Sequence, residues 1–118
     1  MMTVQEICRL LEAKVLCCHH SLGREVKSAC GSDLMSDVLA FVKDHTVLLT
    51  GLNTSQAIRT AEMLDVTCIV FVRGKKPSED VLNMAEERDI PIMTTYYSMY
   101  DACGILFSSG LPGVPREQ

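Results

Sequence analysis

Three polar turns follow apolar runs in this chain, and their side chains are of types that bind small anions. The first is Gly51-Leu52-Asn53-Thr54-Ser55, where small residues expose backbone N–H groups and Asn53, Thr54 and Ser55 add amide and hydroxyl donors. A helix N-terminus at such a turn is a natural anion site. Because most such turns bind nothing, Gly51 serving only the turn, with Thr54 or Ser55 capping the helix, is an equally simple interpretation.

The second turn, Arg73-Gly74-Lys75-Lys76, places one guanidinium and two ammonium groups after the next apolar run. These cations suit a phosphate or a carboxylate. The alternative is a solvated loop whose Ser78 caps the following helix.

The third turn is Thr94-Thr95-Tyr96-Tyr97-Ser98, whose aromatic rings could stack on a base or a sugar. The rings suit an interface between two chains equally well, and Ser98 is also a suitable helix cap. Taking the three turns together, we predict a ligand-binding set of Gly51, Asn53, Thr54, Ser55, Arg73, Gly74, Lys75, Thr95 and Tyr96.

The cluster Cys17-Cys18-His19-His20 has the residue types of a metal site or of a thiol nucleophile. Neighbouring strand residues point to opposite faces, so Cys17 and Cys18 are not expected to share an ion. We therefore predict a chance cluster, with no metal site and no catalytic residues. A thiol-dependent transferase using one of these cysteines with an adjacent histidine is an alternative, but adjacency is its only support.

The elements that position these turns follow from apolar periodicity. The runs at 46–50 and 68–72 are apolar with no polar alternation, which is typical of parallel strands covered by helices on both faces. Ligands of such sheets bind at the carboxyl ends of the strands. We predict an α/β fold, a three-layer domain with a mainly parallel sheet flanked by helices. Its helices are expected at 4–12, 34–43, 55–64, 78–88 and 98–107, and its strands at 14–18, 26–30, 46–50, 68–72 and 91–94.

A length of 118 residues predicts a single domain over 1–118, with its core at about 26–108. The tail at 109–118 contains two Pro and two Gly and is expected to fray. Hydrophobic residues make up 47% of the chain, which is generous for its size and favours a homodimer or a docking face.

Charge and cysteine placement indicate what the protein is not expected to bind and where it is expected to occur. The net charge is −4 and no basic run exceeds Lys75-Lys76, so we predict no nucleic-acid binding. No stretch of 18 apolar residues occurs, so no membrane segment is expected. Cys8 falls in a predicted helix and Cys68 in a predicted strand, which favours reduced thiols and a cytoplasmic location.

The stretch from Thr46 to about Leu106 resembles a DRTGG domain. The resemblance is carried by Gly51-Leu52-Asn53-Thr54, by the segments at 68–74, 77–81 and 85–88, and by Ile90-Pro91-Ile92. The chain is also similar to the N-terminal domain of the HPr serine kinase/phosphorylase. DRTGG domains occur alone, beside CBS domains in pyrophosphatases, or joined to phosphotransacetylase. The resemblance implies a regulatory, ligand-sensing module without catalytic activity, with a kinase-like or redox enzyme as a possible protein partner.

The family signature is eroded in this chain. Aligned on Gly51, the family's Asp and Arg fall on Leu52 and Asn53, and its Gly pair falls on Arg73 and Gly74, so only Thr54 and Gly74 are kept. The phosphate-binding loop of the kinase lies in its other domain, so phosphoryl transfer is not implied.

The function predicted from the sequence is a non-catalytic regulatory module that needs no cofactor. It would bind a small anionic ligand, such as a nucleotide, at the carboxyl ends of its strands. The alternative is a structural adaptor that dimerises or docks a partner enzyme without any small ligand.

Overall fold

The main sheet has five strands in the order β2-β7-β6-β5-β4. The structure, a computed structural model, describes residues 2–115. Four strands run parallel, and β2 pairs antiparallel with β7 at one edge. The predicted mainly parallel sheet is therefore confirmed. Its strands are β2 (Lys14–Cys17), β4 (Ser28–Gly31), β5 (Thr46–Thr50), β6 (Cys68–Phe71) and β7 (Ile92–Thr94).

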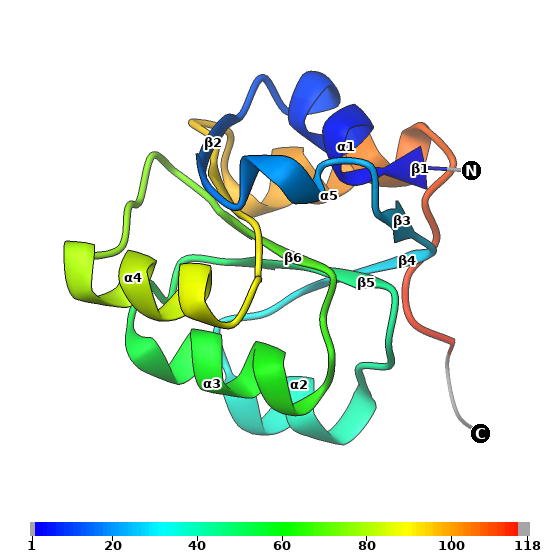
Figure 1. Ribbon diagram of the computed structural model, residues 1–118. Coiled ribbons are helices and arrows are strands. Elements are labelled where there is room, and N and C mark those ends of the chain that lie inside the picture. The colour runs from blue at the N-terminus through cyan, green and yellow to red at the C-terminus, as the bar shows by residue number, and fades with distance from the viewer. Residues whose placement is uncertain (1, 116–118) are drawn as a thin grey trace.

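Helices cover both faces of this sheet and complete the predicted three layers (Figure 1). One outer layer holds α2 (Met35–Phe41), α3 (Ser55–Met63) and α4 (Glu79–Glu87). The other holds α1 (Val4–Leu10) and α5 (Met99–Ser108). No helix between residues 2 and 115 has the length and hydropathy needed to cross a membrane.

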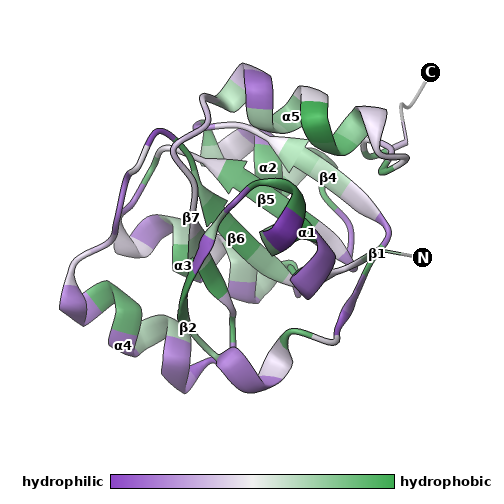
Figure 2. Ribbon diagram, turned by 90° about the horizontal axis from the view of Figure 1, so that it is seen from above, coloured by the Kyte–Doolittle hydropathy of each residue, from purple (hydrophilic) through white to green (hydrophobic). Residues whose placement is uncertain are grey.

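The central strands are apolar throughout because their successive side chains alternate between two hydrophobic cores, one on each face of the sheet. Leu48 and Ile69 pack with the layer of α2, α3 and α4, whereas Val47 and Leu49 pack with the layer of α1 and α5. All four side chains are fully buried. Figure 2 shows hydrophobic residues along β5 and β6 and hydrophilic residues on α1 and α4. A strand buried on both faces has no position left for polar alternation.

The predicted strand at 26–30 is two strands in different sheets. β3 (Glu25–Val26) pairs antiparallel with β1 (Met2–Thr3), whereas β4 begins at Ser28 and joins the main sheet beside β5. The preceding loop contains a short 3₁₀ helix over His19–Ser21. The other predicted elements are present, with ends that differ by at most two residues from those expected.

Several helices end on an acidic residue with a left-handed backbone. Glu12, Asp65 and Asp89 have φ values of 49°, 55° and 57° and follow α1, α3 and α4. After each, the next amide reaches back to a carbonyl in the last turn, as in the bond of 2.9 Å from Val66 N to Ala61 O. Glycine is the usual residue at such a position.

Two boundary predictions are corrected by the packing. The core extends beyond 26–108, because Val4, Ile7 and Leu11 of the first helical segment are fully buried. The tail does not fray directly after α5: Leu111 is only 4% exposed, and the Ala29 amide donates to the Pro112 carbonyl at 2.9 Å. Residues 116–118 of the predicted frayed tail lie outside the described residues.

Candidate functional site

A cleft of about 750 Å³ lies at the carboxyl ends of the parallel strands. Each of the four parallel strands leads into a segment that lines it, as the strand-end rule for parallel sheets predicts. Of the predicted ligand-binding residues, the structure brings Gly51, Arg73 and Lys75 together here. The full lining is Asp33, Gly51, Val72, Arg73, Lys75, Ser98, Met99 and Tyr100.

The first turn is already bound to a carboxylate of the protein itself. Asp33 Oδ1 accepts a hydrogen bond of 2.6 Å from the Gly51 amide and one of 2.9 Å from Thr50 Oγ1. The amide predicted to bind an external anion is therefore occupied by Asp33. Thr54 precedes α3 without a side-chain capping bond, and neither Thr54 nor Ser55 lines the cleft.

The second turn has a fixed backbone and free cationic side chains. Arg73 and Gly74 both have left-handed φ values, 60° and 71°, and the Lys75 amide donates to the Val72 carbonyl at 3.1 Å. The Arg73 and Gly74 amides donate to the carbonyls of Tyr97 and Thr95 at 2.8 and 2.7 Å. Within residues 2–115, neither the Arg73 guanidinium nor the Lys75 ammonium group has an ion-pair or hydrogen-bond partner.

Two predicted ligand residues instead hold the loops in place. Asn53 Nδ2 donates to the Lys76 carbonyl at 2.8 Å and so ties the first turn to the second. Thr95 is buried, and its Oγ1 donates to the Leu11 carbonyl at 2.7 Å while accepting from the Tyr97 amide at 3.3 Å. Both side chains stabilise the loops through these hydrogen bonds, and neither lines the cleft.

The aromatic residue on the cleft is Tyr100, which the sequence reasoning missed. Tyr96 lies over Gly74 instead, so closely that a Cβ added to Gly74 would stand 2.9 Å from its ring. Tyr100 lies in the first turn of α5, lines the cleft and is 87% exposed. Tyr100 could have been identified from its place in the sequence, because it lies in the first turn of the helix that follows the third polar turn.

The cleft is locally positive in a chain of net charge −4, because Arg73 and Lys75 face the single carboxylate of Asp33. The N-terminus of α5 adds to this. Ser98 Oγ caps the helix by accepting from the Asp101 amide at 3.1 Å. The amides of Met99 and Tyr100 have no acceptor within the described residues. Free helix-start amides and cations favour a bound anion.

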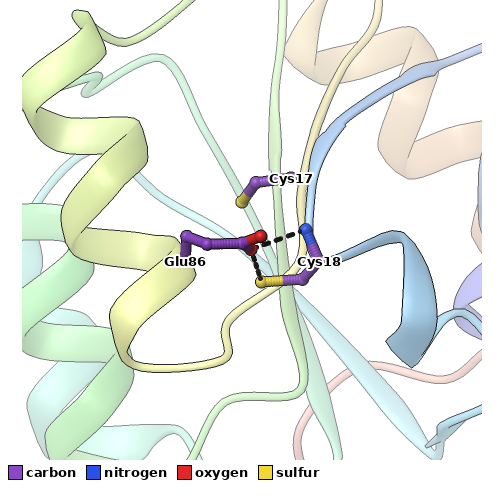
Figure 3. A group of neighbouring side chains, drawn as sticks. All are labelled: Cys17, Cys18 and Glu86. Atoms are coloured by element: carbon purple, nitrogen blue, oxygen red, sulfur yellow. Dashed lines mark hydrogen bonds between the residues drawn. The ribbon is translucent and has the colours of Figure 1, made fainter.

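A second cluster lies at the opposite end of the parallel strands, where they begin. We call this side of the sheet the amino edge and the side with the cleft the carboxyl edge. At the amino edge, Cys17 pairs with Ile92 at the start of β7. The prediction that Cys17 and Cys18 diverge is wrong, because Cys18 follows the strand with a left-handed φ of 59°. The two sulfurs and a carboxylate oxygen of Glu86 lie within 4.8 Å of one another (Figure 3). Glu86 Oε2 accepts from Cys18 Sγ at 2.8 Å and from the Cys18 amide at 2.9 Å.

These thiols do not have the features of an activated nucleophile. Burial, followed by the hydrogen bond to the Glu86 carboxylate, raises the pKa of Cys18, and burial also raises the pKa of Cys17. A nucleophilic cysteine needs the opposite shift. His19 is exposed, and His20 Nε2 lies 2.9 Å from Asp89 Oδ1, so neither histidine is bonded to the thiols.

Known proteins resemble this chain in sequence family and in fold. The family model described as DRTGG domain matches residues 6–108. No match was found among curated proteins. A similar solved structure contains the CBS and DRTGG domains of the regulatory region of Clostridium perfringens pyrophosphatase, complexed with the activator diadenosine tetraphosphate. Its TM-score is 0.69 at 16% identity, and the match covers 95% of this chain and 50% of that one. The chain therefore shares the fold and spans half the length of that structure.

Proposed function

Because the chain belongs to the DRTGG domain family, we propose that it is a non-catalytic regulatory module that senses a small anionic ligand at the carboxyl edge of its sheet. One observation carries this proposal. Within residues 2–115, the cations of Arg73 and Lys75 have no partner in a cleft that also contains the free amides at the start of α5. Exposed cations of this kind bind phosphate or carboxylate oxygens.

A nucleotide polyphosphate is the ligand that uses the whole cleft. Its phosphates would lie against Arg73 and Lys75, and the exposed ring of Tyr100 would stack on the base. Asp33, already bonded to Gly51, would repel a phosphate placed over the first turn and so direct it toward the two cations. The similar pyrophosphatase regulatory region is complexed with a nucleotide activator, which makes nucleotides the first class to test.

Binding would be transmitted by adding a ligand-mediated link between two segments that are otherwise joined through the backbone hydrogen bonds of Arg73 and Gly74. The Arg73–Lys75 turn and the start of α5 both line the cleft, and one ligand contacting both would restrict their relative motion. A regulatory module needs only that its conformational freedom differ between the free and the ligand-bound state, and it needs no chemical step.

The alternative function, an adaptor that dimerises or docks a partner enzyme, is favoured by the outer surface of α2. Leu34 and Phe41 are 58% and 57% exposed. Leu34 directly precedes α2 and Phe41 is its last residue. We propose this surface as the contact of a homodimer. Sedimentation of the wild type and of Phe41→Glu tests it: a concentration-dependent dimer that Phe41→Glu abolishes is expected, and a monomer at all concentrations overturns it.

The sensing proposal is tested by thermal unfolding with ATP, diadenosine tetraphosphate and pyrophosphate. A ligand at a hundredfold its Kd stabilises the native state by about 2.7 kcal/mol, which raises Tm by roughly 10 °C. We expect Arg73→Ala and Lys75→Ala to abolish the shift. The matched control is Lys76→Ala, which removes a neighbouring exposed cation that does not line the cleft. A flat response to all three compounds, or an equal loss in the control, contradicts the proposal.

A further inference from the structure

The cluster of Cys17, Cys18 and Glu86 is a set of three ligand groups that converge on one point. Cys17 is the last residue of β2, Cys18 follows it, and Glu86 lies in the last turn of α4 (Figure 3). Cys17 and Cys18 are 7% and 1% exposed as residues, while Glu86 is exposed to solvent. Buried sulfur beneath an accessible carboxylate gives a site that an ion can enter from one side.

Two local distortions bring the adjacent thiols to the same side. The pairing of β2 with β7 shifts register between Val15 and Cys17, and Cys18 then takes a left-handed backbone. A non-glycine residue in that conformation costs on the order of 1 kcal/mol. Among the described residues, the Cys18 side chain and amide are held there only by α4, through Glu86 and a sulfur contact of 3.8 Å with the Ala85 carbonyl.

We propose that Cys17, Cys18 and Glu86 bind a thiophilic divalent cation, with Zn²⁺ the best match and water as its fourth ligand. Tetrahedral Zn²⁺ with bonds of about 2.3 Å to sulfur and 2.1 Å to oxygen places sulfur atoms roughly 3.8 Å apart and sulfur and oxygen roughly 3.6 Å apart. The three ligand atoms already lie within 4.8 Å of one another. Only small side-chain movements separate this arrangement from the coordinated one.

The polar neighbours suit this role. The Cys18 amide donates to Glu86 Oε2, and this bond can persist while the other carboxylate oxygen coordinates the ion. On binding, each thiol releases its proton to solvent, so two thiolates and one carboxylate face the dication and the site carries a net charge of −1. The bond from Cys17 Sγ to the Ile90 carbonyl, 3.4 Å long, is lost in exchange. Thiolate ligands select Zn²⁺ over Mg²⁺ and Ca²⁺, which prefer oxygen.

The ion would cross-link β2 to α4 at the amino edge, away from the ligand cleft. Cys17 pairs with Ile92, the first residue of β7, whereas the cleft is lined by residues that follow the ends of the parallel strands. Metal binding is therefore expected to be independent of Arg73 and Lys75.

The test is equilibrium dialysis of the full chain against Zn²⁺ alone, with the thiols kept reduced by a phosphine that does not itself supply sulfur ligands. We expect one Zn²⁺ per chain and a loss of affinity of at least about a hundredfold in Cys17→Ala and in Cys18→Ala. Glu86→Gln is expected to bind at least about tenfold more weakly. The matched control is Cys103→Ala, because Cys103 is a partly buried free thiol in α5 outside the cluster.

A second measurement keeps the proposal falsifiable if Cys18→Ala fails to fold. Co²⁺ bound to the wild type should show thiolate-to-metal charge-transfer absorption with the intensity of two sulfur ligands, and Cys17→Ala should halve it. Absence of Zn²⁺ uptake at micromolar concentration overturns the proposal. So does uptake that Cys17→Ala leaves unchanged, or that Cys103→Ala abolishes.

Discussion

The two edges of the main sheet use their charged side chains differently. At the amino edge, the Asp89 carboxylate contacts Arg24, Ser21 and His20, and the Arg24 guanidinium also donates to the Asp89 carbonyl at 2.8 Å. At the carboxyl edge, the Arg73 and Lys75 side chains have no such partners within residues 2–115. The polar groups at the amino edge therefore bond one another, whereas the cations at the carboxyl edge are available to a ligand.

This difference separates stability from ligand binding. Groups that bond one another lose those bonds when one is replaced, so the amino edge is expected to respond in stability. Unpaired exposed cations contribute little to folding, so replacing them should change binding alone. The carboxyl edge nevertheless has a structural layer beneath its cations, formed by Asp33, Asn53, Thr94 and Thr95.

The largest effect is expected from Thr95→Val in that structural layer. Valine keeps the shape but leaves the buried Leu11 carbonyl and the Tyr97 amide without the bonds that Thr95 Oγ1 makes. Unsatisfied groups of this kind cost about 2 kcal/mol of unfolding free energy. The control at the amino edge is Thr67→Val, because Thr67 is only 8% exposed as a residue and its hydroxyl is not among the buried groups left without a partner within residues 2–115. Equal urea midpoints for the two variants would contradict the assignment of Thr95 to structure.

Gly74→Ala is expected to lower the unfolding free energy by about 1.5 kcal/mol. The backbone has a φ of 71°, where an L side chain is strained, and the new methyl group would meet the Tyr96 ring at 2.9 Å. The matched variant is Gly104→Ala in α5, where no atom lies within 4 Å and alanine should stabilise the helix by about 1 kcal/mol. Thermal unfolding that shifts both variants in the same direction would show that the turn is not as constrained as its geometry indicates.

Asp89→Gly tests the amino edge and is expected to cost roughly 1 kcal/mol, since the carboxylate is half-exposed and screened by solvent. Burial raises the pKa of Asp89, but the hydrogen bonds from Arg24, Ser21 and His20 outweigh it and hold the pKa below its usual value. A lowered folded pKa means that this stabilisation is present above the unfolded value of about 3.9 and is lost as pH falls through the folded value. Urea unfolding at pH 7 and pH 3 should show the gap between wild type and variant closing in acid.

The strands and layers could be predicted because their signals are local. Residues 46–50 and 68–72 are apolar throughout, and that pattern has few structural solutions. The position of the cleft followed from chain order alone, since Gly51 and Arg73 come directly after neighbouring strands. On that basis the sequence predicts that Gly51, Arg73 and Lys75 lie at the same cleft, where the structure places them.

The remaining site features depend on contacts that the sequence does not encode locally. Asp33 reaches Gly51 across 18 positions of the chain, so no local pattern predicts that its carboxylate occupies the first turn. Cys18 approaches Glu86 across 68 positions, and only a left-handed backbone, unexpected for cysteine, turns it toward Cys17. Tyr96 was expected at the ligand but packs over Gly74 instead, because the turn at Arg73–Gly74 brings Gly74 under its ring. The aromatic ring that lines the cleft is that of Tyr100.

The smallest expected effect, and the closest test of the amino edge, is Asp65→Gly. Asp65 follows α3 as Asp89 follows α4, with nearly the same φ, but its side chain has no partner within residues 2–115. Glycine relieves the left-handed strain and removes a negative charge from a helix C-terminus, and these gains exceed its entropy cost by about 0.5 kcal/mol. Chemical unfolding should therefore show Asp65→Gly slightly stabilised and Asp89→Gly destabilised. If both variants gain stability, the contacts of Asp89 contribute less than the strain it carries, and the amino edge is not held by its paired charges.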